Sequence, residues 1–447
     1  MTEGSISKKM IMFALPVFLG QLLQQLYNVV DSVVVGNFLG KEALAAVSST
    51  GSLIFLLVGF INGLFTGAGV IVGNRFGAKD YKAVHTAVHT AIAFGVVMGL
   101  ILMAVGVFAS PAILRMMGTP DDVIDNSILY LRIIFLGGLG NVLYNTCCGI
   151  FQAMGDSRHP LYYLVTSSII NMILDLLFVI VFKMGIGGAA LATIIAQYIS
   201  ATLAFTKLTR TDGPHRLTVK DIKIDPDTLK QELKIGFPTG IQNSVIAIAN
   251  VIVQSNINAF GSVAMAGSGS YFKLEGFAFL PINSFCVALT TFTSQNLGAG
   301  NFERAKKGAR FGITAGVCCA ELIAVCLFIF ARPFLSIFGQ DNDVLSYGTL
   351  QIRTEALFYC LLAYSHCMAS VLRGAKRSIV PMFVMLGCWC LFRITYITAA
   401  IKIFPVIRTI YWAYPITWSL SSIIFTIYYF KVKMFDPNAY ENLKKTV

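Results

Sequence analysis

Charged side chains are scarce in this sequence. Asp, Glu, Lys and Arg make up only 13% of the 447 residues, where a soluble domain carries about 25%. Hydrophobic residues make up 56%, so water is not the main solvent of the chain. This balance excludes extensive disorder, collagen repeats and small disulfide-stapled folds. A nucleotide site is also missing, because residues 36–42 are one residue short of a phosphate-binding loop and lack a Ser or Thr after Lys41.

Long apolar runs between polar clusters predict an all-α polytopic membrane protein with twelve transmembrane helices. All ten cysteines lie inside these runs, which indicates packing rather than disulfides. The first run has no signal-peptide cleavage pattern, so it is itself a span. The spans are expected at 10–37, 44–72, 84–109, 126–153, 159–182, 187–208, 235–259, 264–295, 308–331, 345–372, 379–401 and 407–431.

The basic residues between the spans predict an orientation. Of the 34 Lys and Arg residues, 24 lie on the side of the two termini, six lie on the opposite side, and four lie within spans. Because short cytoplasmic loops are enriched in Lys and Arg, both termini are expected in the cytoplasm of a cell-membrane protein. The excess of basic residues, a net charge of +12, therefore reflects the orientation of the chain in the membrane. The expected partner is the lipid bilayer rather than nucleic acid, and we expect a monomer.

The two halves of the chain resemble each other at an offset of 221 residues. Arg132 matches Arg353, Pro160 matches Pro381, and Pro16 pairs with Pro238 after one residue of slippage. The repeat predicts two pseudo-symmetric six-helix bundles with the same orientation in the membrane. The predicted parts are an N-lobe at 1–208, a cytoplasmic linker at 209–234, a C-lobe at 235–431 and a cytoplasmic tail at 432–447.

The linker contains a helix start signal and no obvious domain of its own. Asp225 followed by Pro226 reads as a capping residue and a first helical position, and predicts a short helix on the membrane surface. Two repeated lobes joined in this way are typical of secondary transporters, in which two bundles expose a central site alternately to each side.

Two carboxylates stand deep inside predicted spans, where burial of a charge costs about 2.5–3.5 kcal/mol. Asp31 shares one helical face with the polar residues 3, 7 and 10 positions before it. Asp175 lies four residues after Asn171, and Thr193 adds a hydroxyl in the next span. Close carboxylates repel each other, and a proton or Na⁺ relieves the repulsion. The alternative to a cation site is a static hydrogen-bonded network of these polar residues that fixes the packing of the helices. The face of Asp31 is expected to line a water-accessible cavity and carries Gln21, Gln24 and Asn28.

These features resemble the multidrug and toxic compound extrusion (MATE) transporters, in particular their DinF-like branch. The resemblance covers the whole chain and rests on Pro16 with Asp31, on Asn171 with Asp175 and Thr193, and on the Gly-Ala loops at 77–78 and 298–299. It implies an antiporter that exports cationic or amphipathic molecules against H⁺ or Na⁺. It also implies that Asp31, Asn171, Asp175 and Thr193 hold the coupling cation, which would be the only metal site if the ion is Na⁺. No cofactor is expected, and the chain is not expected to be an enzyme.

The second half lacks a copy of this acid pair. Ile252 and Tyr396 stand at the repeat equivalents of Asp31 and Asp175, and residues 242–244 lack the early acid of NorM-like members. The half still carries polar residues within its spans. From position and, for Glu275, from the resemblance, the expected substrate-cavity residues are Gln242, Asn250, Gln254, Glu275 and Asn283. Arg393 is either a partner of Glu275 or a contact for an acidic lipid.

Two rival functions remain open. A lipid-linked oligosaccharide flippase of the same superfamily would need a basic central groove, whereas the deep charges of the first half are acidic. A membrane-embedded transferase is less well supported, because His366 is the only histidine deep inside a span. His85 and His89 are spaced as metal ligands, but without a third ligand nearby in sequence an interfacial role is favoured. The sequence does not identify the natural substrate or choose between H⁺ and Na⁺.

Overall fold

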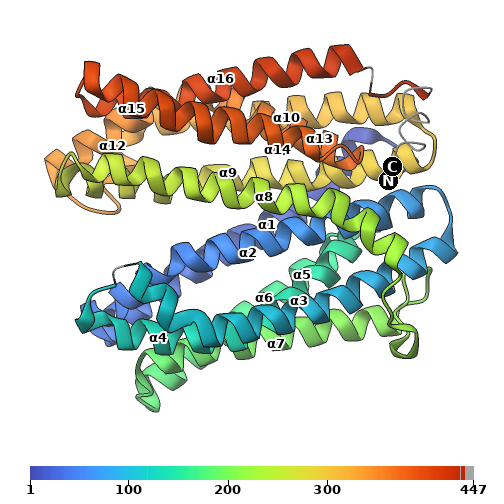
Figure 1. The fold of residues 1–447 in the computed structure, drawn as a ribbon, viewed down its shortest axis with the longest axis horizontal. Helices are drawn as coiled ribbons and strands as arrows, with labels where there is room; N and C mark the ends of the chain where they lie inside the picture. The colour runs from blue at the N-terminus through green and yellow to red at the C-terminus, as the bar shows by residue number, and fades with distance from the viewer. Residues whose placement is uncertain (118, 433, 438–447) are drawn as a thin grey trace. The chain divides into compact units, whose positions relative to one another are not determined.

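The structure, a computed structural model, describes residues 1–117, 119–432 and 434–437. It leaves out the side chains at positions 32, 33, 37, 40–42, 44, 45, 48, 49, 52, 121 and 122. Most of the predicted tail, 432–447, lies outside the described residues. Within them every regular element is a helix, as predicted (Figure 1).

The first half of the chain forms seven α-helices and one π-helical segment. They are α1 (Ile6–Phe38), α2 (Gly40–Gly77), α3 (Tyr81–Met116), α4 (Asp121–Leu136), α5 (Gly138–Ala153), α6 (Arg158–Asp175), η1 (Leu176–Val181) and α7 (Gly185–Arg210). The π-helical turns of η1 follow directly after Asp175. Such turns occur often at functional sites.

The second half repeats this order of helices. A 3-10 turn, η2 (Val219–Asp221), precedes it. Its elements are α8 (Pro226–Asn258), α9 (Ser262–Gly298), α10 (Phe302–Ile329), α11 (Ala331–Leu335), α12 (Asn342–Glu355), η3 (Ala356–Phe358), α13 (Tyr359–Gly374), α14 (Ile379–Met385), η4 (Leu386–Phe392), α15 (Arg393–Ile403) and α16 (Ile407–Val432). The starts of α1, α2 and α3 recur at α8, α9 and α10 at nearly the offset of the sequence repeat.

Most of the predicted spans correspond to helices of sufficient length. Ten described helical stretches are long and apolar enough to cross a membrane, and the pair Val123–Leu136 with Gly138–Ala153 adds an eleventh. This pair is bent by 45°, so the predicted span 126–153 is not one straight helix. The twelfth predicted span falls on α16, a helix of 26 residues that is not among these stretches.

The prediction of a short surface helix in the linker is wrong. Its start is right, because α8 begins at Pro226 and the Thr228 N–H donates to the Asp225 carboxylate at 2.8 Å. The helix is not a short separate one, however, but continues without a break to Asn258. The sequence has no breaker between Pro226 and Gly236, and Pro238 is accommodated inside the helix. The helix that carries the seventh predicted span therefore begins before residue 235.

Contacts divide the chain into two compact units. The N-terminal unit is Leu19–Gly236, and the C-terminal unit is Met1–Phe18 together with Phe237–Val447. The units are defined by contacts and the predicted lobes by membrane topology, so the predicted lobe, linker and tail boundaries stay predictions.

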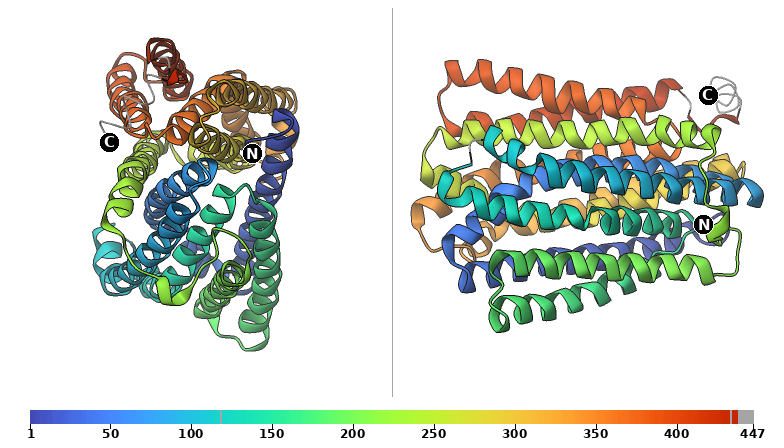
Figure 2. Two further views of the ribbon diagram at one scale, coloured as in Figure 1. Left: turned by 90° about the vertical axis from the view of Figure 1, so that its right-hand side faces the viewer. Right: turned by 60° about the horizontal axis from the view of Figure 1, so that its bottom comes forward.

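The N-terminal unit is built from helices in direct contact. α3 packs on α4 and α5, and α7 packs on α5 and α6. The last pair, α6 and α7, runs side by side in Figure 2. The first turns of α8 approach α2 at Gly67 and Gly236, where a Cβ on either glycine would overlap the backbone carbonyl of Glu232 or Leu64. Glycine permits this backbone contact because it has no side chain.

In the C-terminal unit, α9 is the central helix. It packs on α10, α12 and α13, and α13 packs on α16. Its interior includes the large buried side chains of Tyr271, Tyr359, Tyr411 and Trp418. Because buried tyrosines need hydrogen-bond partners, this interior has to contain polar groups as well as apolar ones.

Candidate functional site

Asn171 connects the acid of α6 to the neighbouring helix α7. Its amide orientation follows from its hydrogen-bond partners: Nδ2 donates to Asp175 Oδ2 at 3.0 Å, and Oδ1 accepts from the Thr193 N–H at 3.1 Å. Asn171 and Asp175 are only 1% and 2% exposed. Three of the four residues predicted to hold the coupling cation are therefore joined by hydrogen bonds.

The fourth residue, Asp31, reaches the same place from α1. Tyr27 precedes it by one helical turn, and the Tyr27 hydroxyl lies 3.5 Å from Thr193 Oγ1. Thr193 Oγ1 donates its own hydrogen to the Ala189 carbonyl at 3.1 Å, so Tyr27 is the donor in this contact. Asp31 is close enough to Asp175 for the two charges to interact. The structure thus gathers Asp31, Asp175 and Thr193 from three different helices.

Two tyrosines belong to this cluster and were missed in the sequence. Tyr27 and the buried Tyr130 of α4 both lie within electrostatic range of Asp31 and Asp175. Tyr27 had a detectable signal, because it is four residues before Asp31 and shares its helical face. Tyr130 had none, since its helix is far from α1 and α6 in sequence.

Each acid of the cluster has an oxygen without a partner. Asp31 Oδ1 and Asp175 Oδ1 are both buried, and neither accepts a hydrogen bond from the described residues. Across the part of the chain that the structure describes, no Lys or Arg side chain forms an ion pair with either carboxylate. A buried oxygen left without a donor is costly. The arrangement can therefore take up a proton or a small cation, which would relieve this cost.

The rest of the predicted polar stripe on α1 is more open. Gln21 is half-buried, with a buried Oε1 that has no partner among the described groups, whereas Gln24 and Asn28 are exposed within their unit. The stripe lies on the helix that carries Asp31, as its spacing predicted.

The predicted cavity residues of the C-terminal unit are not all brought together. Gln242 is buried on α8 and donates to Met385 Sδ at 2.8 Å. Gln254, three turns further along the helix, donates to Asn258 at 2.8 Å. Asn283 is half-buried on α9. Only Asn250 and Glu275 have a common neighbour, which is Arg393.

Arg393 is enclosed in protein. It is 1% exposed, donates to Thr417 Oγ1 at 2.9 Å and lies 4.4 Å from the centre of the Tyr414 ring. Its charge acts on both Glu275 and Glu355. This burial excludes the acidic-lipid contact. The Arg393 charge lies within electrostatic range of Glu275 and Glu355, but no ion pair of Arg393 is found among the described residues, so its partnership with Glu275 stays a prediction.

Glu355 is a fully buried acid of the same unit, and no partner for it was evident in the sequence. Tyr271 donates to Glu355 Oε2 at 2.7 Å, and Gln351 donates to Oε1 at 2.9 Å. The Tyr359 hydroxyl lies 3.0 Å from that of Tyr271. Glu355 is fully buried, and the charge of Glu275 acts on it. The C-terminal unit therefore has its own pair of neighbouring acids, here with hydrogen-bond donors and an arginine.

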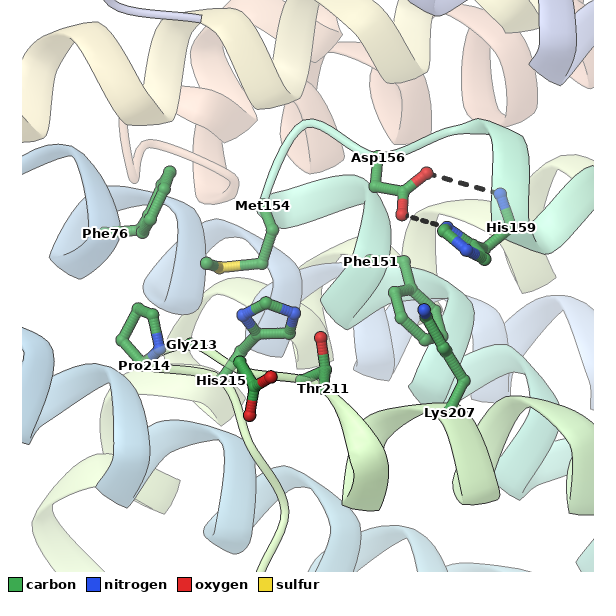
Figure 3. A pocket seen from close by; sticks show the side chains of 11 residues that line it. Phe76, Phe151, Met154, Asp156, His159, Lys207, Thr211, Gly213, Pro214 and His215 are labelled. Atoms are coloured by element: carbon green, nitrogen blue, oxygen red, sulfur yellow. Dashed lines mark hydrogen bonds and ion pairs between the residues drawn. The ribbon is translucent and has the colours of Figure 1, made fainter.

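A separate pocket of about 320 Å³ lies at the ends of α2, α5 and α7 in the N-terminal unit. Figure 3 shows His215 and Pro214 on one side of it and Asp156 with His159 on the other. Asp156 accepts from the His159 ring at 2.5 Å. Burial lowers the pKa of His215, whose buried Nδ1 has no partner within the described chain. None of the predicted site residues lines this pocket.

Repeated long apolar helices with acids buried among them define a polytopic membrane protein of the transporter class. The MatE family profile matches residues 16–177 and again 238–397, once in each half. The chain therefore belongs to the MatE family, the MATE transporters. It is a transmembrane transporter and not an enzyme.

Curated relatives and solved structures agree with this family. The chain is 28% identical over 393 residues to the probable multidrug resistance protein YpnP of Bacillus subtilis, covering 87% of both chains. It is 22% identical to the multidrug export protein MepA of Staphylococcus saprophyticus, covering 86% of both. A crystal structure of MATE in complex with MaL6 matches with a TM-score of 0.89 at 21% identity, over 95% of this chain and 96% of the other. These likenesses confirm the predicted fold class.

Proposed function

We propose that this chain is a cation-coupled antiporter of the DinF-like branch that exports amphipathic or cationic small molecules. Asp31, Asn171, Asp175 and Thr193 form its coupling site. The observation that carries the proposal is that carboxylates from α1 and α6 lie within electrostatic range of each other, each with a buried oxygen that lacks a hydrogen-bond donor among the described residues. The missing acid at residues 242–244 supports the DinF-like branch over the NorM-like one.

Coupling requires that the cation and the exported molecule disfavour each other. When one H⁺ or Na⁺ binds to the Asp31–Asp175 pair, it removes one negative charge that would attract a cationic substrate, and release of the ion restores that charge. Because such coupling is reciprocal, substrate binding expels the ion to the same extent. We propose as substrate contacts the stripe of Gln21, Gln24 and Asn28 in the N-terminal unit and, independently, the predicted polar residues Gln242, Asn250, Gln254, Glu275 and Asn283 in the C-terminal unit. The transported ion is thus a substrate and not a resident cofactor.

The coupling ion would be held by carboxylate oxygens from two helices, α1 and α6, with Asn171 and Thr193 holding Asp175 in place. Asn171 fixes Asp175 Oδ2 and the backbone of Thr193, which leaves Asp175 Oδ1 and Asp31 Oδ1 for the ion. A proton needs one of these oxygens, whereas Na⁺ would use both and add water. We further propose that the protein lies in the cell membrane as a monomer with both termini in the cytoplasm, on the basis of the distribution of its basic residues.

Dye efflux from proteoliposomes tests the proposal, with a pH gradient and a Na⁺ gradient imposed separately. We expect one gradient to drive efflux in the wild type and neither to do so in Asp31→Asn or Asp175→Asn. Asp125→Asn is the matched control, because Asp125 is an exposed acid of the same unit and should leave efflux intact. Full efflux by both acid variants would refute the coupling site. Flipping of a lipid-linked sugar without dye efflux would identify the protein as a flippase instead.

A further inference from the structure

Two histidines near the start of α3 lie beneath the segment that leads into α8. His85 and His89 are one helical turn apart, and their rings stack with centres 3.9 Å apart. The segment from Thr211 to Asp225 folds back over them: the Thr218 N–H donates to His89 Nε2 at 3.0 Å, and the Asp225 N–H donates to Thr90 Oγ1 at 3.2 Å. The histidines therefore contact residues about 130 positions further along the chain.

This segment brings a carboxylate to the histidine pair. Asp221, at the end of η2, places Oδ2 3.7 Å from His85 Nε2. The ligand atoms of His85, His89 and Asp221 all lie within 4.8 Å of one another. The third ligand that the sequence alone did not provide is thus supplied by the fold.

The hydrogen bonds of His89 fix its tautomer. His89 Nδ1 lies 2.7 Å from the His85 carbonyl, which only accepts, so Nδ1 carries the hydrogen. Nε2 then has the lone pair, which accepts from the Thr218 N–H. Histidines that bind metals are held in this way, with one nitrogen donating to a backbone carbonyl and the other free for the ion.

We propose that His85, His89 and Asp221 bind a divalent transition metal ion of the zinc class, which clasps the 211–225 segment onto α3. In a tetrahedral zinc site with bonds of 2.0–2.2 Å, neighbouring ligand atoms are about 3.4 Å apart. The distance between His85 Nε2 and Asp221 Oδ2 needs to shorten by only a few tenths of an ångström to reach this. Two imidazoles and one carboxylate are ligands that suit zinc and nickel, with water in the fourth position.

Binding requires two local adjustments. The stacked rings turn so that both Nε2 lone pairs point at one ion, and the ion replaces the Thr218 N–H at His89 Nε2. Access is open, since the side chains of His85 and Asp221 are 42% and 51% exposed. Lys223 also acts electrostatically on His85, and the Asp221 carboxylate offsets this positive charge at the site.

Calorimetric titration of the full-length chain in detergent tests the proposal. The protein is purified with a histidine-free tag, treated with EDTA and titrated with ZnCl₂. We expect one ion per chain in the wild type, loss of this site in His85→Ala, and binding at least ten-fold weaker in Asp221→Asn. His159→Ala is the matched control, because His159 also pairs with an aspartate but lies outside the cluster, and it should bind zinc like the wild type.

A second measurement separates a clasp from accidental surface binding. Limited proteolysis should cut the 211–225 segment more slowly with zinc than without it in the wild type and in His159→Ala, but at equal rates in His85→Ala. The proposal is overturned if wild type and His85→Ala bind zinc equally, if His159→Ala loses as much binding as His85→Ala, or if zinc does not protect the wild-type segment.

Discussion

Asn171 donates to Asp175 from one turn earlier on the same helix while its carbonyl oxygen accepts from the backbone of Thr193. One amide therefore fixes both the orientation of the acid and the distance between α6 and α7. It satisfies Asp175 Oδ2 and leaves Oδ1 without a partner within the described residues. The acid is thus held in place while it keeps one oxygen available for an ion, which is the preorganisation that a binding site needs.

Asn171→Ala should lower the stability of the N-terminal unit. The change removes the donor to Asp175 Oδ2 and the contact with the Thr193 N–H, and a buried polar group left without its partner costs about 1–3 kcal/mol. A lower apparent melting temperature of the purified protein in detergent would record this loss. Asn62→Ala, at an exposed position of α2, provides the baseline and should melt like the wild type. Equal melting of both variants would show that the amide bridge does not hold the two helices.

Gly67→Ala should destabilise the same unit by forcing α2 away from α8. The added Cβ would overlap the Glu232 carbonyl, and overpacking of this kind costs about 1–3 kcal/mol. Gly51→Ala is a matched change in the same helix, where nothing lies within 4 Å of the new Cβ. It should be neutral or stabilise by up to about 1 kcal/mol, because alanine favours the helix. A melting temperature that falls in both variants, or in neither, would contradict the close contact at Gly67.

His215 should make the stability of the protein depend on pH. Burial lowers the pKa of His215, and Lys207 acts in the same direction while Asp156 opposes it. The unfolded chain, with a histidine pKa of about 6.5, then binds the proton more readily than the folded one. The stability contributed by neutral His215 is therefore complete above about pH 6.5 and declines as the pH falls below it.

The test of this pH dependence compares the wild type with His215→Gln. On acidification from about pH 8 to about pH 5, the melting temperature of the wild type should fall more steeply, because only in the wild type does unfolding release a buried neutral ring that then takes up a proton. The values at about pH 8, where the wild-type ring is neutral, give the cost of the substitution itself. Parallel curves over the whole range would rule His215 out as the source.

Much of the N-terminal site was predictable because its residues are close in sequence. Asn171 and Asp175 are one turn apart, and Thr193 follows in the next helix, so a helical period and a short loop suffice to bring them together. That Asp31 and Asp175 come from separate helices and still meet required the three-dimensional packing of α1 beside α6 and α7. The period of α1 indicated only that Asp31 faces away from lipid.

The polar residues of the C-terminal unit were harder to interpret. Gln242 and Gln254 are both glutamines of α8. Gln242 donates to Met385 of α14, whereas Gln254 donates to Asn258 on its own helix. Glu355 had no partner in the sequence, because Tyr271 stands 84 residues away. Contacts at such separations depend on how α9 packs on α12, and no local pattern contains that information.

Tyr271→Phe should destabilise the C-terminal unit through Glu355. The change removes only the hydroxyl that donates to Glu355 Oε2 at 2.7 Å and meets the Tyr359 hydroxyl at 3.0 Å, while the ring is retained. Tyr271 is 1% exposed, so water cannot replace the lost donor, and the expected cost is about 1–3 kcal/mol. Tyr162→Phe makes the same chemical change at a side chain that is 56% exposed and should leave the melting temperature unchanged. If the two variants melt alike, the hydroxyl of Tyr271 does not stabilise the buried acid.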